Sequence, residues 1–189
     1  FKVIAGLLKQ KSGTVKILDQ EVSSKNRKIF QQVGCLIEQV SLYPHLTGYE
    51  HIQIVAKLTD TKIDEHVETL ISTLKMNSYI HNKTKTYSQG MKQRLGILLA
   101  VLNKPKLLLL DEPLNGLDPE GVYEIRTFLL NICHQEGMSL LISSHILSEM
   151  QIFCDRFLFL KDGVISKDLT KSDLKNSNLE QEFIEDNQE

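Results

Sequence analysis

The sequence has no long hydrophobic run, no closely spaced cysteines and no marked excess of charge of one sign. Its longest apolar run, residues 95–102, has eight residues, whereas a membrane-spanning helix needs about 18 or more. We therefore do not expect this chain to form a pore by itself. Cys35, Cys133 and Cys154 lie far apart without C-x-x-C spacing. This argues against a zinc site or a disulfide framework and fits a reducing compartment.

The charges nearly cancel, since 22 Lys and Arg face 24 Asp and Glu, for a formal net charge of −2. Most nucleic-acid-binding domains are basic, so we expect no nucleic acid as a partner. Hydrophobic residues make up 41% and charged residues 24% of the 189 residues. This is an ordinary globular composition, with enough apolar material for the core of one domain.

Strand-like and helix-like patterns alternate along the chain, which predicts an α/β fold with a mostly parallel sheet. The predicted strands are 14–18, 33–37, 107–110, 139–143 and 157–160. Helical patterns between about 49 and 103 interrupt the alternation and predict an inserted helical subdomain. We expect this domain to span residues 1–170 and to be followed by a polar tail, 171–189, with a short amphipathic helix.

The chain begins with Phe1 rather than Met, and residues 1–8 have the pattern of a helix already under way. They show neither an N-cap nor an acidic first turn, and no signal-peptide pattern follows. We therefore expect the sequence to be a fragment whose N-terminal strands lie further upstream.

Four leucines, residues 107–110, are followed directly by Asp111 and Glu112. In open α/β sheets, ligands bind beyond the carboxyl ends of the strands. An aspartate there can hold Mg²⁺, and a neighbouring glutamate can orient or deprotonate an attacking water. The alternative is a strand that simply ends in two solvated acids before a turn.

Three further features follow helix and strand boundaries. Ser88 can cap a long helix, and Gly90 in its first turn leaves room for a ligand where free amides favour phosphate. Asp118 precedes Pro119 in another helix start, and His145 follows the predicted strand 139–143. Taken singly, each has a plain structural alternative: a capped helix with a basic first turn, an N-cap, and a structural histidine.

In this order and at these spacings, the features resemble the nucleotide-binding domain of the ABC transporter ATPases over nearly the whole chain. In that family two ATPase domains dimerise head to tail around two ATP molecules. The resemblance implies a P-loop NTPase-like fold in which Ser88, Gln89 and Gly90, in the signature motif, bind the ATP held by the second domain. The resemblance also implies that Asp118 links the two ATP sites of the dimer.

The same resemblance implies that Asp111 holds Mg²⁺, that Glu112 is the catalytic base and that His145 senses the γ-phosphate. The glutamine expected after the strand 33–37 is replaced by Glu38, with Gln39 beside it. Either residue could fill the role, and we favour Glu38 as a ligand of ATP and Mg²⁺. The signature also departs from the usual L-S-G-G-Q, because residues 87–91 read Y-S-Q-G-M; its serine and second glycine remain.

The phosphate loop of the family, G-x-x-x-x-G-K-[ST], does not occur in the sequence. We expect it immediately before Phe1, with roughly 35–45 residues upstream in all, since the loop normally follows a strand. Its lysine and backbone amides hold the β- and γ-phosphates. The 189-residue chain is therefore expected to be inactive and to bind ATP weakly or not at all, and micromolar affinity for MgATP would contradict this.

Residues 36–38 and 42–50, the signature 87–94 and the segment 179–183 resemble the exporters that protect bacteria from lantibiotics and bacitracin. The function implied first is ATP-driven export in lantibiotic self-immunity, with bacitracin-type resistance or export of another cargo as alternatives. The partners implied are a transmembrane permease and a second ATPase domain, at the cytoplasmic face of the membrane. An ABC-type ATPase of DNA repair or translation is a further alternative, although no long coiled coil interrupts the motifs.

Overall fold

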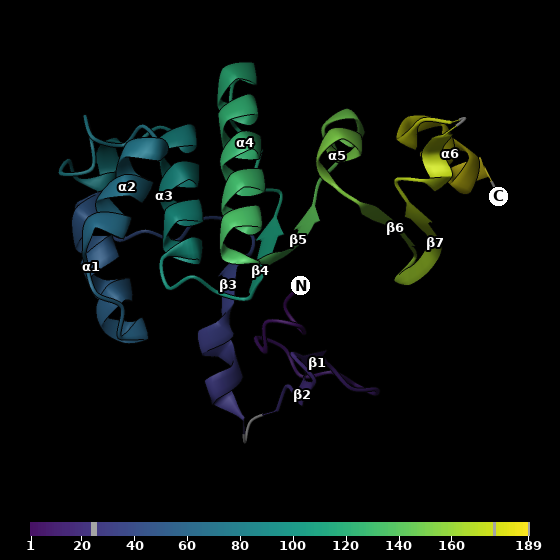
Figure 1. Cartoon of the computed structure of the whole chain (residues 1–189), viewed down its shortest axis with the longest axis horizontal. Helices are drawn as coiled ribbons and strands as arrows, with labels where there is room; N and C mark the ends of the chain where they lie inside the picture. The colour runs from purple at the N-terminus through teal and green to yellow at the C-terminus, as the bar shows by residue number, and fades with distance from the viewer. Residues whose placement is uncertain (24–25, 176, 189) are drawn as a thin grey trace. The chain divides into compact units, whose positions relative to one another are not determined.

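A parallel sheet of three strands organises the first part of the chain in the computed structural model (Figure 1). The strands are β3 (Val33–Leu36), β4 (Leu107–Asp111) and β5 (Ser139–Ser143), paired in the order β3-β4-β5. Leu108 and Leu110 in the central strand have no exposed surface, as expected for a strand covered on both faces. The α/β fold with a parallel sheet is thus confirmed.

The structure describes residues 1–23, 26–175 and 177–188. The chain forms two compact units, Phe1–Ser143 and Ser144–Glu189. The expected domain boundary near residue 170 stays a prediction. Within the described ranges, no helix combines the length and the apolar character that crossing a membrane requires.

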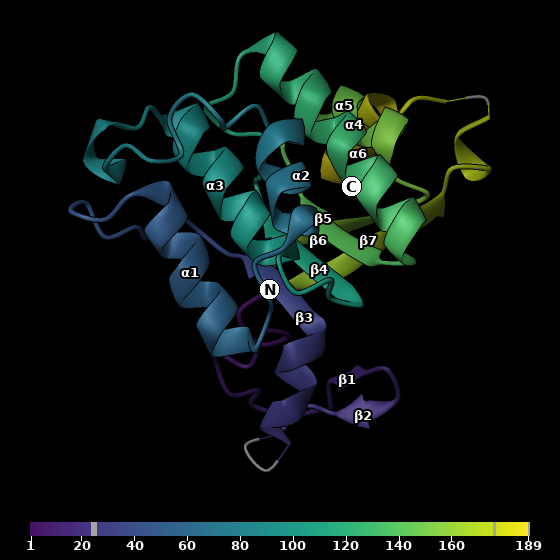
Figure 2. The same ribbon diagram turned by 60° about the vertical axis from the view of Figure 1, so that its left-hand side comes forward.

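Helices α1 (Gly48–Thr59), α2 (Glu65–Thr73) and α3 (Gln89–Val101) fill the connection from β3 to β4, where a helical subdomain was predicted (Figure 2). The predicted capping box at the start of α1 is present. Thr47 Oγ1 accepts from the amide of Glu50 at 3.1 Å, and the Glu50 carboxylate accepts from the amide of Thr47 at 2.7 Å. Such caps fix where a helix begins because they satisfy its first free amides.

Helix α3 lies directly against the first strand of the sheet. A side chain at Gly34 would place its Cβ only 1.9 Å from the carbonyl oxygen of Ala100, and a Cβ at Gly96 would lie 2.7 Å from Val40. Glycine at both positions therefore allows the helix and the strand to approach closely. This contact holds the helical connection on the sheet.

Helix α4 (Pro119–Glu136) returns the chain from β4 to β5. Asp118 caps its first turn, since its carboxylate accepts from the amide of Gly121 at 3.1 Å. Gly137 ends the helix with φ of 61°, in the left-handed region that favours glycine. Both boundaries agree with the prediction. The buried residues of α4 are Gly121, Ile125, Phe128, Leu129 and Ile132.

The expected helix over residues 1–8 is not formed. The segment makes turns, with the amide of Ala5 bonded to the carbonyl of Phe1 at 2.9 Å, and Gly6 has φ of 69°. A single turn that ends at a left-handed glycine gives too few hydrogen bonds to offset helix nucleation. A short antiparallel pair, β1 (Lys16–Ile17) and β2 (Gln20–Glu21), and the 3₁₀ helix η1 (Arg27–Gln32) follow.

The second unit contains an antiparallel pair, β6 (Arg156–Lys161) and β7 (Val164–Thr170), between α5 (Leu147–Phe153) and α6 (Leu179–Gln188). The predicted turn at residues 162–163 joins the two strands. Its residues have φ of 51° and 81°, as hairpin turns of this kind require.

Within this unit, α6 packs on β6 and β7. The rings of Phe183 and Phe159 meet edge to face with centroids 5.8 Å apart, and Ser166 donates to Asp186 at 2.7 Å. The short helix predicted in the polar tail is thus present and has a packing surface.

Candidate nucleotide site

The two predicted acidic residues lie at the carboxyl end of β4. Asp111 is paired in register with Ser143 at the end of β5, and the Ser143 hydroxyl donates to Asp111 Oδ1 at 2.5 Å. The amide of Glu112 donates to both the carbonyl and the hydroxyl of Ser143, at 3.2 and 3.1 Å. The acid pair is therefore anchored to the neighbouring strand rather than lying on a free loop.

Glu38 follows β3, which ends at the same edge of the sheet because β3 and β4 are parallel. It has φ of 63°, its side chain is 63% exposed, and it forms an ion pair with Lys2. Glu38 and Asp111 are thus placed at one edge by different strands.

Mg²⁺ prefers oxygen ligands and is usually held by one or two carboxylates together with substrate phosphates and water. Across residues 1–23, 26–175 and 177–188 no cluster of three or more acidic, histidine or cysteine side chains could hold a metal. Asp111, with Glu38 at the same sheet edge, suits an ion that needs few protein ligands. The residues present therefore fit Mg²⁺ delivered with a nucleotide.

The predicted signature residues form the start of α3. Ser88 Oγ accepts from the amide of Met91 at 3.2 Å, which confirms the predicted cap. A side chain at Gly90 would place its Cβ 3.3 Å from Leu117. The start of α3 thus packs closely against the turn that follows β4, and this turn carries Asp118.

A pocket of about 460 Å³ opens where these two segments meet. Its lining residues are Lys75, Tyr79, Ser88, Gln89, Gly90, Met91, Arg94, Gly116, Leu117 and Asp118. The structure therefore brings together four of the predicted ATP-binding residues. The free amides at a helix N-terminus favour an anionic ligand.

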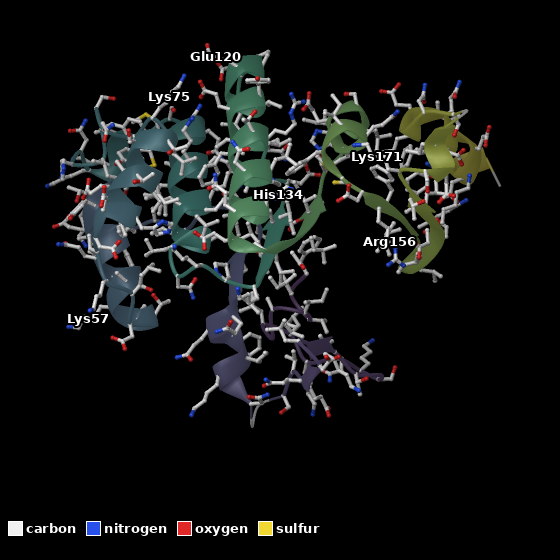
Figure 3. The ribbon with its side chains drawn as sticks, viewed as in Figure 1. Lys57, Lys75, Glu120, His134, Arg156 and Lys171 are labelled. Atoms are coloured by element: carbon white, nitrogen blue, oxygen red, sulfur yellow. The ribbon has the colours of Figure 1, made fainter. Side chains whose placement is uncertain are left out.

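Ion pairs and a hydrogen bond connect α3 with α4 and with the segment that follows α2, around this pocket. Arg94 of α3 donates to Glu124 of α4 at 2.7 Å and to the carbonyl of Leu74 at 3.2 Å. Lys75, directly after α2, pairs with Glu124 and lies 3.7 Å from Glu120; Lys75 and Glu120 are labelled in Figure 3. The hydrogen bond from Lys75, and then that from Arg94, hold the pKa of Glu124 below its ordinary value.

Replacing Glu124 with glutamine should lower the free energy of unfolding at pH 7 by about 1–3 kcal/mol, as for loss of hydrogen bonds to a charged group. Because the pKa of Glu124 is lowered by folding, its stabilising effect is complete above the unfolded-state pKa of about 4.3. The effect disappears as pH falls through the lower folded-state pKa. The difference between wild type and variant should therefore shrink under acid conditions, as measured by urea unfolding across pH.

Glu120→Gln is the matched control, because Glu120 is on the same helix and its side chain is 77% exposed. An exposed ion pair contributes about 0–1 kcal/mol, so this variant should change stability little. Equal losses for the two variants at pH 7 would show that the pairs at Glu124 do not stabilise this unit.

His145 belongs to the second unit, Ser144–Glu189. It is exposed and lines a pocket of about 410 Å³ with Ile146, Leu147, Ser148, Glu180, Phe183 and Ile184. The acid pair belongs to the first unit, and the expected role of His145 stays a prediction.

Sequence reasoning did not single out Ser143, Gln93 or Glu124. Gln93 is 4% exposed, and its side-chain amide donates to the carbonyl of Glu112 at 3.4 Å. Gln93 lies on an apolar helix face and Ser143 ends an apolar strand. A polar residue in such a position indicates that it has a polar partner. The partners themselves depend on strand register and helix packing.

Comparison with known proteins identifies the family to which the chain belongs. The family model described as ABC transporter matches residues 1–115. An uncharacterized ABC transporter ATP-binding protein of Bacillus subtilis, YdbJ, is 39% identical over 170 residues, which are 90% of this chain and 55% of that protein. The chain therefore belongs to the ABC transporter family, and it spans little more than half the length of relatives such as YdbJ.

Two relatives have names that state a cargo. The bacitracin transport ATP-binding protein BcrA of Enterococcus faecalis is 37% identical, over 94% of this chain and 58% of that protein. The lantibiotic transport ATP-binding protein SrtF of Streptococcus pyogenes is 36% identical, over 97% of this chain and 77% of that protein.

Solved structures agree on the fold. An ATP-binding subunit of an ABC transporter has a TM-score of 0.87 and 25% identity, over 98% of this chain and 81% of that one. A dimeric ATP-binding cassette bound to ADP and Pi has a TM-score of 0.80 and 21% identity, over 90% of this chain and 78% of that one. The fold is thus that of an ABC ATP-binding domain.

Proposed function

We propose that the protein carrying this chain is the ATP-hydrolysing subunit of an ABC exporter. The observation that carries the proposal is the acid pair, Asp111 and Glu112, anchored by Ser143 at the carboxyl edge of the parallel sheet. Ligands of open α/β sheets bind at this edge. Family membership adds the reaction class, hydrolysis of ATP to ADP and phosphate.

In this proposal Glu112 is the general base. It accepts a proton from the water whose oxygen bonds to the γ-phosphorus, while the bond from that phosphorus to the bridging oxygen of ADP breaks. Asp111 holds Mg²⁺, and Glu38 contributes to binding Mg²⁺ and ATP at the same edge. When bound, Mg²⁺ offsets negative charge on the β- and γ-phosphates.

We propose that Ser88, Gln89 and Gly90 bind ATP held by a second ATPase domain. The pocket at the start of α3 supports this, because it joins these residues to Asp118. A dimeric cassette with the same fold supports the pairing of two domains. His145 is proposed to contact the γ-phosphate.

The sequence contains no G-x-x-x-x-G-K-[ST] segment, whose lysine and amides would hold the β- and γ-phosphates. We therefore propose that the 189-residue chain on its own binds ATP weakly and is inactive. Hydrolysis is assigned to the whole protein.

We further propose that the cargo is a lantibiotic and that export gives the producing cell self-immunity. The support is the 36% identity to SrtF, of which the chain covers 77%, together with the segment around Glu38. The other partner is a transmembrane permease, which places the protein at the cytoplasmic face of the membrane. Bacitracin is the second candidate cargo, because BcrA is 37% identical over 94% of the chain.

The test is a susceptibility assay. The whole protein is expressed together with a candidate permease in a host sensitive to lantibiotics and bacitracin. Minimal inhibitory concentrations are measured for both antibiotics. Protection against a lantibiotic that disappears with Glu112→Gln supports the first proposal. Protection against bacitracin alone would make bacitracin the cargo in place of a lantibiotic. Protection against neither antibiotic would contradict both cargo proposals.

A further inference from the structure

The hydroxyl of Ser143 contacts both members of the acid pair. It lies 2.5 Å from Asp111 Oδ1 and 3.1 Å from the amide nitrogen of Glu112. Ser143 is the last residue of β5 and is paired in register with Asp111. This pairing is what brings the side chains at the ends of the two strands together.

The direction of both hydrogen bonds follows from the groups involved. An amide N–H can only donate, and an ionised carboxylate can only accept. The Ser143 hydroxyl must therefore give its proton to Asp111 and offer a lone pair to the amide of Glu112. One hydroxyl group thus restrains both the Asp111 carboxylate and the peptide that begins Glu112.

Glu112 needs such support because its backbone is unusual. It has φ of 49°, in the left-handed region that non-glycine residues seldom adopt. Its amide bonds to Ser143, and its carbonyl accepts from the amide of Asn115 at 3.2 Å and from Gln93 at 3.4 Å. Polar groups on both sides of the residue thus hold the turn that aims its side chain.

We propose that Ser143 is a positioning residue for ATP hydrolysis, setting the orientation of Asp111 toward Mg²⁺ and of Glu112 toward the attacking water. The proposal rests on the proposed ATPase function and adds a residue to it. Residues that orient a metal ligand typically change metal affinity or activity by about 10- to 100-fold when lost. We therefore expect a loss of this size when the hydroxyl is removed.

The test uses the whole protein and three variants. Ser143→Ala removes the hydroxyl, Ser143→Thr keeps it, and Ser139→Ala makes the same deletion at the exposed first residue of the same strand. For each, kcat and KM for ATP hydrolysis are measured. Binding of Mn²⁺ in place of Mg²⁺, with a non-hydrolysable ATP analogue present, is followed by electron paramagnetic resonance, and Tm reports folding.

We expect Ser143→Ala to lower kcat by about tenfold or more and to weaken Mn²⁺ binding, with KM for ATP nearly unchanged and a Tm that still lies above the assay temperature. Ser143→Thr should restore both properties, and Ser139→Ala should resemble wild type. Wild-type kcat and Mn²⁺ affinity in Ser143→Ala would overturn the proposal. Equal losses in the alanine and threonine variants with a lowered Tm would also overturn it, because the hydroxyl would then not be the cause.

The wild-type protein separates this proposal from the one on which it rests. If wild type hydrolyses ATP and Ser143→Ala does so equally well, only the role of Ser143 fails. If wild type does not hydrolyse ATP, the proposed function fails, and the Mn²⁺ measurement still shows whether the hydroxyl orients Asp111.

Discussion

Replacing Glu112 with glutamine in the whole protein should lower ATP turnover by about 10²-fold or more, as for loss of a general base, while ATP binding is kept. Glutamine has nearly the same size as glutamate but cannot take a proton from the attacking water. The amide and the carbonyl of residue 112 form hydrogen bonds that glutamine can form as well. The substitution therefore removes the proton acceptor and keeps these backbone hydrogen bonds of the turn.

The measurement is steady-state phosphate release together with equilibrium binding of ATP. Glu120→Gln makes the same chemical change on an exposed side chain of α4 and should turn over like wild type. A variant with ATP bound and turnover lost would support Glu112 as the base. Unchanged turnover in Glu112→Gln would remove Glu112 from this role, and loss of ATP binding would point to a structural one.

Local chemistry allowed several boundaries of the fold to be predicted from the sequence. Thr47 with Glu50, Ser88 and Asp118 each cap the helix that they were expected to start. A cap depends on residues within one turn of each other, and so does a left-handed C-cap such as Gly137. The apolar run before Asp111 likewise identified the central strand, because burial on both faces demands it.

Features that depend on distant partners were not predictable in this way. The bond from Ser143 to Asp111 spans 32 positions in the sequence and requires the register of β4 with β5. The pair between Arg94 and Glu124 requires α3 and α4 to pack side by side. Arg94 could be recognised as part of a basic helix start, but neither its partner nor its burial followed from that pattern.

In the candidate site, too, some features could be predicted from local sequence and others could not. The sequence order of the motifs indicated the family, and the pocket at α3 brings Ser88, Gln89, Gly90 and Asp118 together. Residues 1–8 were expected to be helical because their apolar spacing suits a helix, but pattern alone does not supply the further turns that stabilise one.

Replacing Gly34 with alanine should destabilise the first unit by about 3 kcal/mol, the upper end of the usual cost of overpacking. The added Cβ would lie 1.9 Å from the carbonyl oxygen of Ala100 and 2.9 Å from Pro105. The first neighbour is backbone in α3, which cannot rotate away as a side chain can. Relief therefore requires β3 to move away from the helix, which also strains its pairing with β4.

The free energy of unfolding from urea titration of the whole protein measures this effect, with Gly13→Ala as the control. Gly13 has nothing within 4 Å of an added Cβ, but its φ is 79°, so alanine there should cost about 1 kcal/mol through backbone strain alone. A loss at Gly34 no larger than that at Gly13 would mean that α3 does not press on β3. A larger loss would show that the close contact between β3 and α3 stabilises the unit that carries Glu38 and Ser88.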